Sequence, residues 1–183
     1  MGKMHAEGVT LIEALVTLAM VGLVLAIGVP AVRDLAASSN MSVAANDLLT
    51  SLHAARVESV KRAAPVILCA SGSWASPDAT CGDGDLADGW IVFADDNPSN
   101  DLRDPAETIV LNHGPLHAGI VLTAPSSIEF SDLGRPSVAA SFLLCDFRGD
   151  RTAGGVTAGR RVTLTATGRP QVLSQPGQVD CSG

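Results

Sequence analysis

The chain has 183 residues, a length that suits one globular domain together with a long helix. Its 12 basic and 19 acidic side chains give a formal net charge of -7, which argues against general nucleic-acid binding. Aromatic residues make up 3% of the chain and tyrosine is absent, which argues against stacking platforms for single-stranded nucleic acid.

The N-terminus begins with a short polar leader, residues 1–8, which has no apolar core and so differs from an ordinary secretory signal peptide. An almost unbroken apolar run follows from Ala14 to Val32, about long enough to span a membrane. Glu13 lies near the start of this run with no basic residue beside it. Because a carboxylate in hydrocarbon costs on the order of 3 kcal/mol or more, its partner is expected to come from another chain. Lys3 favours a cytoplasmic N-terminus.

The helical pattern continues beyond the apolar run to about Arg62. Pro30 removes a backbone donor and is expected to bend the helix, which then resumes. The second half carries an apolar face with helical spacing, formed by Leu35, Met41, Ala45, Leu48, Leu52 and Ala55. Pro65 is expected to stop the helix.

Short β-rich runs, separated by Gly, Pro, Asp and Asn, follow the helix. The expected strands are residues 66–69, 90–94, 108–111, 120–123, 128–131, 141–145, 161–166 and 171–173. One long helix followed by consecutive strands predicts an α+β fold, with an antiparallel sheet packed on the amphipathic half of the helix. Gly154-Gly155 indicates a turn, and we find no convincing internal repeat.

Four cysteines lie after the apolar segment, at Cys69, Cys81, Cys145 and Cys181. An even number in a domain outside the inner membrane indicates two disulfides, for which three pairings are open. We favour Cys69–Cys81, which brackets a Gly/Ser/Asp-rich loop, and Cys145–Cys181, which would tie down the C-terminal tail. A zinc site is the weaker alternative because no C-x-x-C spacing occurs.

A polar loop carries oxygen ligands at alternate positions, at Asp95, Asn97, Ser99 and Asp101, together with Asp96. The spacing resembles part of a calcium loop, but the glycine and the final glutamate of an EF-hand are missing. An Asp/Asn/Pro turn explains the pattern without a metal.

Two histidines, His113 and His117, are four residues apart. Gly114 and Pro115 between them argue against the helical geometry of a zinc site, so we interpret both as solvent-exposed loop side chains. We therefore predict neither a metal nor a cofactor.

Residues 8–13 read Gly-Val-Thr-Leu-Ile-Glu. With the apolar run and Pro30, they closely resemble the class III signal of type IV pilins and pseudopilins. The resemblance implies that a prepilin peptidase cuts between Gly8 and Val9 and methylates the new N-terminus of Val9. It also implies that Glu13 serves assembly, by pairing with the N-terminal amine of a neighbouring subunit or by setting the register of insertion. Pro30 would kink or locally melt the helix.

The rest of the chain resembles the GspH/FimT/FimU group of minor pilins and pseudopilins. The matching segments are residues 47–69, residues 81–97 with Asp-Gly-Trp-Ile-Val-Phe, Gly134-Arg135-Pro136, Leu144-Cys145 and Cys181. The resemblance implies a type IV pilin-like fold in three parts. These are a cleaved leader at 1–8, a transmembrane and assembly half of the helix at 9–33, and a periplasmic head at 34–183.

The expected role is structural, because no nucleophile–base arrangement, Gly-rich phosphate loop or paired-carboxylate motif stands out. The resemblance implies a minor pilin that joins a type IV pilus or its tip or initiation complex. The alternatives are minor pseudopilin H of a type II secretion system and a pilus-associated DNA-binding subunit for natural transformation. The expected partners are other major and minor pilins or pseudopilins, the prepilin peptidase, and inner-membrane lipid before assembly. The chain would cross the inner membrane once, with its C-terminal domain in the periplasm, and then enter a periplasmic or surface filament.

The DNA alternative comes from relatives of the FimT branch, some of which bind DNA through a C-terminal Gly-Arg-x-Arg element. The nearest match here, at residues 168–171, lacks the second arginine, and the match at residues 159–162 is also incomplete. Arg160, Arg161 and Arg169 are the candidate DNA contacts. The net acidic charge favours the plainer interpretation, in which they are strand-edge arginines that keep the sheet soluble.

Overall fold

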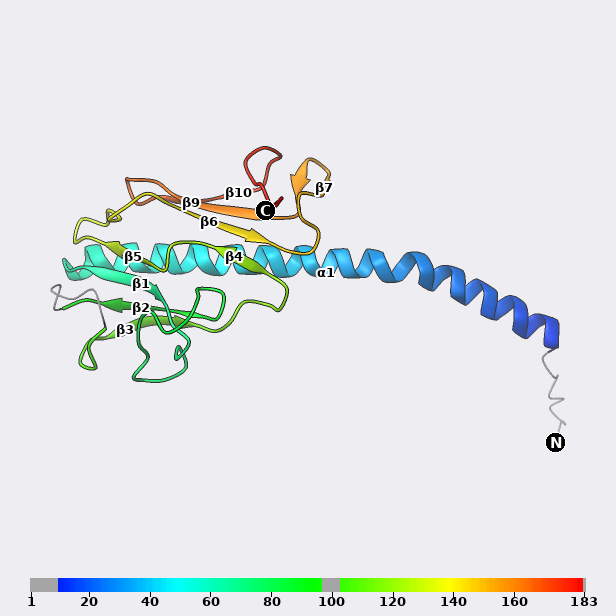
Figure 1. Cartoon of the computed structure of the whole chain (residues 1–183), viewed down its shortest axis with the longest axis horizontal. Coiled ribbons are helices and arrows are strands. Elements are labelled where there is room, and N and C mark those ends of the chain that lie inside the picture. Colours follow the sequence, from blue (N-terminus) through cyan, green and yellow to red (C-terminus); the bar gives the residue numbers. More distant parts are fainter. Residues whose placement is uncertain (1–9, 97–102, 183) are drawn as a thin grey trace, which may run out of the picture. The chain divides into compact units, whose positions relative to one another are not determined.

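The computed structural model describes residues 10–96 and 103–182. It divides into two compact units, residues 1–38 and 39–183, each of which is described by itself. Helix α1 (Leu11–Arg62) belongs to both (Figure 1). The strands that follow it are β1 (Val66–Ala70), β2 (Trp90–Ala94), β3 (Ile109–His113), β4 (Val121–Thr123), β5 (Ser127–Phe130), β6 (Ala140–Cys145), β7 (Thr152–Ala153), β8 (Val156–Thr157), β9 (Arg160–Leu164) and β10 (Pro170–Leu173).

Helix α1 begins with a capped first turn. The Oγ1 of Thr10 accepts a hydrogen bond from the backbone N–H of Glu13 at 3.3 Å, and the Thr10 carbonyl accepts one from the N–H of Ala14 at 3.1 Å. Thr10 is therefore the N-cap residue. The helix then continues without interruption through Pro30, so no local melting is found there. Because Pro30 has no N–H, the carbonyl of Ala26 lacks its helical donor.

The C-terminal end of α1 stops just before Pro65, as predicted. Ala63 has a φ of 52°, and the N–H of Ala64 donates to the carbonyl of Ser59 at 3.3 Å. This six-to-one hydrogen bond around a left-handed residue is the pattern of a Schellman cap. The chain then turns directly into β1.

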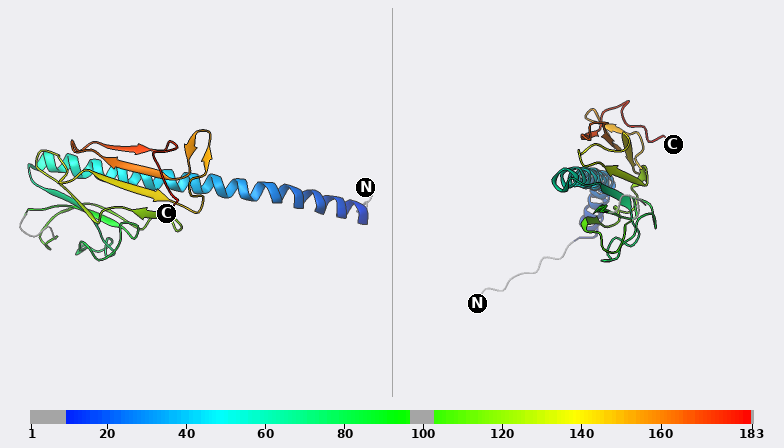
Figure 2. Two further views of the ribbon diagram at one scale, coloured as in Figure 1. Left: turned by 45° about the horizontal axis from the view of Figure 1, so that its top comes forward. Right: turned by 90° about the vertical axis from the view of Figure 1, so that its left-hand side faces the viewer.

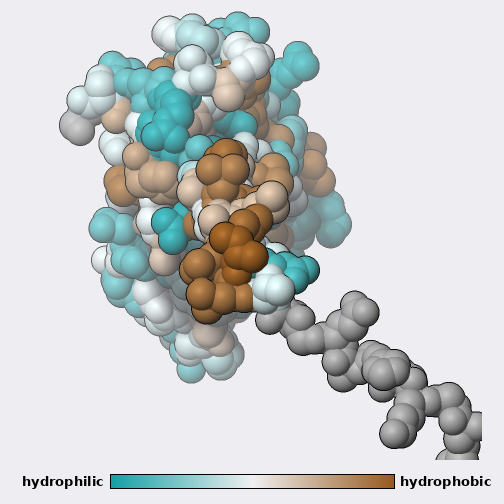
Figure 3. Space-filling model, turned by 90° about the vertical axis from the view of Figure 1, so that its right-hand side faces the viewer, coloured by the Kyte–Doolittle hydropathy of each residue, from teal (hydrophilic) through white to brown (hydrophobic). Residues whose placement is uncertain are grey.

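The part of α1 in the first unit exposes an apolar surface. It contains an 18-residue stretch that is long and apolar enough to cross a membrane, and none of that stretch is buried. Figure 3 shows apolar side chains of this part of the helix gathered together. Leu35 is also 71% exposed, whereas we expected it on the packed face; burial along α1 begins only at Met41.

The second unit contains two four-stranded antiparallel sheets and a small hairpin. The strand orders are β3-β2-β1-β5 and β10-β9-β6-β4, and β7 pairs with β8. Figures 1 and 2 show the two larger sheets flanking the second half of α1. The predicted α+β fold, a helix packed on antiparallel strands, is confirmed, with the strands divided between two sheets.

The main core lies between α1 and both sheets. The predicted helix face enters it through buried side chains, which include Met41, Ala45, Leu48, Leu52 and Ala55. They meet Phe130 of one sheet and Phe142 of the other, both fully buried. The helix therefore holds the two sheets together through one continuous apolar cluster.

Strands β1 and β2 are buried along their whole length because both faces of their sheet are covered. Val66 and Leu68 point into the main core, whereas Ile67 and Cys69 enter a second cluster on the other face. Trp74 and other side chains of the loop between the two strands pack on that second cluster. Two-sided burial explains why these strands are continuous apolar runs instead of alternating ones.

The eight predicted strands all form, and their ends differ from the predicted ones by at most two residues. The hairpin of β7 and β8 was missed because strands of two residues, Thr-Ala and Val-Thr, are too short to show an alternating pattern. Gly154 and Gly155 make its turn with φ values of 59° and 78°, which confirms the predicted turn.

Candidate assembly site

Glu13 lies in the exposed first turns of α1. Its backbone N–H is held by Thr10, but across residues 10–96 and 103–182 its carboxylate has no hydrogen bond or ion pair. Gly8 and Val9, the predicted processing residues, fall outside the part of the chain that the structure describes. The described helix thus presents a carboxylate without a partner at the start of an uncovered apolar surface, which is an arrangement suited to contact with another chain.

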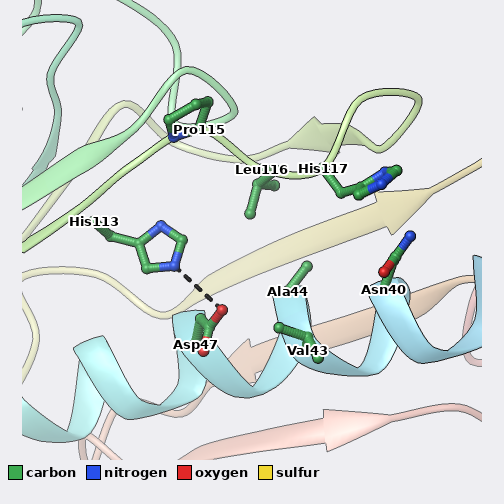
Figure 4. Close-up of a pocket in the computed structure, with 8 residues that line it drawn as sticks. All are labelled: Asn40, Val43, Ala44, Asp47, His113, Pro115, Leu116 and His117. Atoms are coloured by element: carbon green, nitrogen blue, oxygen red, sulfur yellow. Dashed lines mark hydrogen bonds and ion pairs between the residues drawn. The ribbon is translucent and has the colours of Figure 1, made fainter.

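A groove of about 190 Å³ opens in the second unit between α1 and the segment after β3 (Figure 4). Asn40, Val43 and Ala44 line its helix side, and Leu116 and His117 line the other. Figure 4 shows the imidazole of His113 at one end, directed at Asp47 of α1. The groove is therefore bounded by a polar contact between helix and strand.

His113 is part of this packed contact, so its interpretation as a solvent-exposed loop residue was wrong. Its ring stacks on the indole of Trp90, with centroids 3.9 Å apart and an interplanar angle of 4°. Its Nε2 lies 3.2 Å from the Oδ2 of Asp47. His117 is exposed, as expected. The neighbouring Trp90 could not be recognised from the local sequence because it lies on a different strand.

Trp90, on which His113 stacks, makes a further hydrogen bond to α1 inside the core. Its indole N–H donates to the Oγ of Ser51 at 2.9 Å, and that hydroxyl donates to the carbonyl of Asp47 at 2.8 Å. A buried indole N–H needs such a partner, and here both partners come from α1. These hydrogen bonds connect β2 (through Trp90) and β3 (through His113) to α1.

Two disulfides fix the loops of the second unit, and they join Cys69 to Cys81 and Cys145 to Cys181. This is the pairing that we favoured from their positions. The first closes the loop that covers one sheet face, where Asp83 accepts hydrogen bonds from the backbone N–H groups of Gly72 and Ser73 at 2.8 and 3.1 Å. Hydrogen bonding by Ser73 is the largest cause that lowers the pKa of Asp83.

The second disulfide ties the C-terminal tail to β6. The N–H of Cys181 also donates to the Oδ1 of Asp150 at 2.6 Å, and Val179 of the same tail is buried. The tail is thus held by one covalent bond and by packing, as its position in the sequence led us to expect.

The candidate DNA contacts do not form one group. Arg160 donates through Nη1 to the carbonyls of Thr157 and Gly159 at 2.5 and 2.9 Å, and burial lowers its pKa. Arg160 and Arg161 are consecutive residues of β9, so their side chains point to opposite faces of the sheet. The Nε of Arg161 donates to the carbonyl of Gln178 at 2.6 Å. Arg169 lies exposed in the turn after β9. DNA contact by these three residues stays a prediction.

The calcium pattern falls largely in residues 97–102, outside the described ranges. Asp95 and Asp96 precede that segment, the first buried and the second exposed. Among the described residues, no three His, Cys, Asp or Glu side chains are grouped closely enough to hold a metal ion.

Comparison with known proteins places this geometry in a family. Residues 44–168, more than half of the chain, match the family model of the type II transport protein GspH. Among curated proteins, no match is found.

Two solved structures have a similar fold, and both are crystal structures of the type IV minor pilin FimU from Pseudomonas aeruginosa, in space groups P21 and P65. The first is 16% identical, has a TM-score of 0.54, and covers 79% of this chain and 95% of that chain. The second is 16% identical, has a TM-score of 0.51, and covers 78% of this chain and 98% of that chain. The fold agrees with the match to the family model. The chain therefore belongs to the GspH family of minor pilins and pseudopilins.

Proposed function

We propose that the chain is a minor pilin of a type IV pilus. A prepilin peptidase would cut between Gly8 and Val9 and methylate Val9, and residues 9–33 would hold the protein in the inner membrane with residues 34–183 in the periplasm. The chain would then join the pilus or its tip or initiation complex, in contact with other major and minor pilins. The observation that carries this proposal is the uncovered apolar part of α1 together with the carboxylate of Glu13, which has no partner among the described residues.

The apolar part of α1 is too extensive to stay in contact with water, so another apolar surface must bury it. Lipid supplies that surface before assembly, and the helices of neighbouring subunits supply it afterwards. Because both surroundings are apolar, the transfer itself changes the free energy little, and packing between helices must favour the filament. Pairing of Glu13 with the amine of a neighbouring subunit would then select the correct register, because a charge left alone there is costly.

The fold similarity to FimU supports the pilus, since those structures are of a type IV minor pilin. The description of the family model, a type II transport protein, supports a second candidate, the minor pseudopilin H of a type II secretion system. Both candidates use the same helix in the same way, so an experiment on cells must separate them.

The deciding experiment compares a strain lacking this gene with the same strain carrying it on a plasmid. Sheared surface pili and secreted protein are measured in parallel. Loss of pili with intact secretion supports the pilus, whereas intact pili with lost secretion supports the pseudopilin. If neither changes, both candidates are refuted, and a DNA-uptake role becomes the leading hypothesis.

A further inference from the structure

Two turns of the head have the same sequence pattern and the same hydrogen bonds. Residues 131–136 read Ser-Asp-Leu-Gly-Arg-Pro and residues 165–170 read Thr-Ala-Thr-Gly-Arg-Pro; we call them the twin turns. In each, the glycine N–H donates to the carbonyl of the first residue at 2.8 Å. The N–H of the first residue donates to the arginine carbonyl, at 2.8 Å in one turn and 3.2 Å in the other. The same loop is thus built once in each large sheet, after β5 and between β9 and β10.

The twin turns contact each other and Arg56 of α1. Gly134 and Gly168 have φ values of 69° and 76°. A Cβ atom on Gly168 would overlap the carbonyl oxygen of Gly134 and lie 3.3 Å from the Nε of Arg56. One on Gly134 would lie 3.2 Å from the Cγ of Arg56 and 2.8 Å from the Cγ2 of Val60. Only glycine allows this approach, which fixes the positions of the arginines that follow.

The contact brings the backbone positions of Arg135 and Arg169 near the side chain of Arg56. Because Arg135 and Arg169 each follow one of the touching glycines, their Cα atoms lie within about 14 Å of each other. Both are exposed, and within residues 10–96 and 103–182 no hydrogen bond or ion pair engages any of the three guanidinium groups. Glu58 of α1 pairs with Lys61 and Arg62 instead. Among the described residues these three cations are thus not directly paired, and Asp132 is the acidic residue within the turns themselves.

The surroundings indicate which kind of anion fits. Guanidinium groups bind carboxylates through paired, planar hydrogen bonds. Val60 of α1, beside the turns, is 54% exposed, and Leu133 within the first turn is 69% exposed. Arginine combined with exposed aliphatic side chains suits a protein contact. A single-stranded nucleic acid would use aromatic stacking, and the net charge of -7 opposes a polyanion.

We propose that the twin turns and Arg56 bind an acidic segment of a neighbouring subunit in the filament. The surface lies at the end of the head where α1 ends, and Figure 1 shows both turns there. This inference rests on the proposed function and specifies one of its subunit contacts.

The test places a photo-crosslinking residue, benzoylphenylalanine, at position 133 of the full chain in its own cells. The crosslinked peptide is identified by mass spectrometry, and the amount of chain in sheared filaments is measured separately. The charge-reversing variant R135E/R169E is compared with R135K/R169K, which keeps the charge, and with R151E, which changes an exposed arginine elsewhere. Unchanged urea midpoints for the purified variants show that each one folds.

We expect a crosslink to an Asp- or Glu-containing peptide of another subunit. It should be reduced about tenfold or more in R135E/R169E, reduced less in R135K/R169K because lysine keeps the charge but loses the paired hydrogen bonds, and retained in R151E. Exchanging the acidic residues of that peptide for lysine should restore the crosslink to R135E/R169E. Crosslinking to nucleic acid, to a segment without acidic residues, or with equal yield in R135E/R169E would overturn the inference while leaving the proposed function intact. If the unmodified chain is missing from filaments, the proposed function fails, and the inference with it.

Discussion

Removing the two disulfides separately should destabilise the head by different amounts. The bonded cysteines are 12 residues apart in Cys69–Cys81 and 36 apart in Cys145–Cys181. The chain-entropy relation for closed loops gives about 3 kcal/mol for the shorter loop and about 4 kcal/mol for the longer one. The variant C145A/C181A should therefore be less stable than C69A/C81A by about 1 kcal/mol. Both changes remove the same atoms, so each variant is a control for the other.

The assay is urea unfolding of the full chain in detergent, followed by the fluorescence of its two tryptophans, the buried Trp90 and the partly buried Trp74. The two variants differ in burial as well as in loop length, because Cys69 is 1% exposed and lies in the second core cluster. If C69A/C81A proves the less stable variant, loop length does not set the order of the two variants, and the prediction made from chain entropy is refuted. A larger slope of free energy against urea in a variant would show that its unfolded state has become more expanded, as loss of a cross-link predicts.

Three further predictions use the same unfolding measurement, read by circular dichroism. Trp90→Phe removes the hydrogen bond to Ser51 and part of a core side chain, and should cost about 2 kcal/mol; no loss would show that the network is dispensable. Gly168→Ala forces a left-handed alanine into a close contact, so it should cost more than the about 1–2 kcal/mol of the conformation alone. Gly177→Ala, with a φ of 81° and open space around it, is its control, and equal costs would contradict the close approach. Asp83→Asn should be less stable than the parent at neutral pH. Because the folded pKa of Asp83 lies below the ordinary 3.8, this difference should fade as the pH falls through that folded pKa, and a constant difference would exclude the carboxylate as its source.

The elements of this fold could be predicted because local patterns control them. The helix end at Pro65, the buried face from Met41 to Ala55 and the eight longer strands all follow from periodicity and turn residues. The division into two sheets could not, because it depends on pairing between strands that are distant in sequence. Strand β1 pairs with both β2 and β5, and neither partner can be read from its own sequence.

Candidate-site residues were predictable only where a short motif contains them. Glu13 stands out because it interrupts an apolar run. His113 was misinterpreted because its stacking partner Trp90 lies on another strand. Gly134-Arg135-Pro136 and residues 168–171 were each singled out in the sequence, but not as two copies of one turn. That repeat was the available signal, but only the structure shows that Gly134 and Gly168 touch.

The most direct measurement is an immunoblot for this chain in sheared filaments and in membranes, from cells that express either the natural protein or Glu13→Ala. We predict that the natural chain is found in the filament fraction. Glu13→Ala should stay in the membrane at a similar total amount, because its apolar helix is intact and only the partner for assembly is lost. Equal amounts of both proteins in the filaments would contradict a role for Glu13 in assembly, and absence of the natural chain from filaments would contradict the minor-pilin function itself.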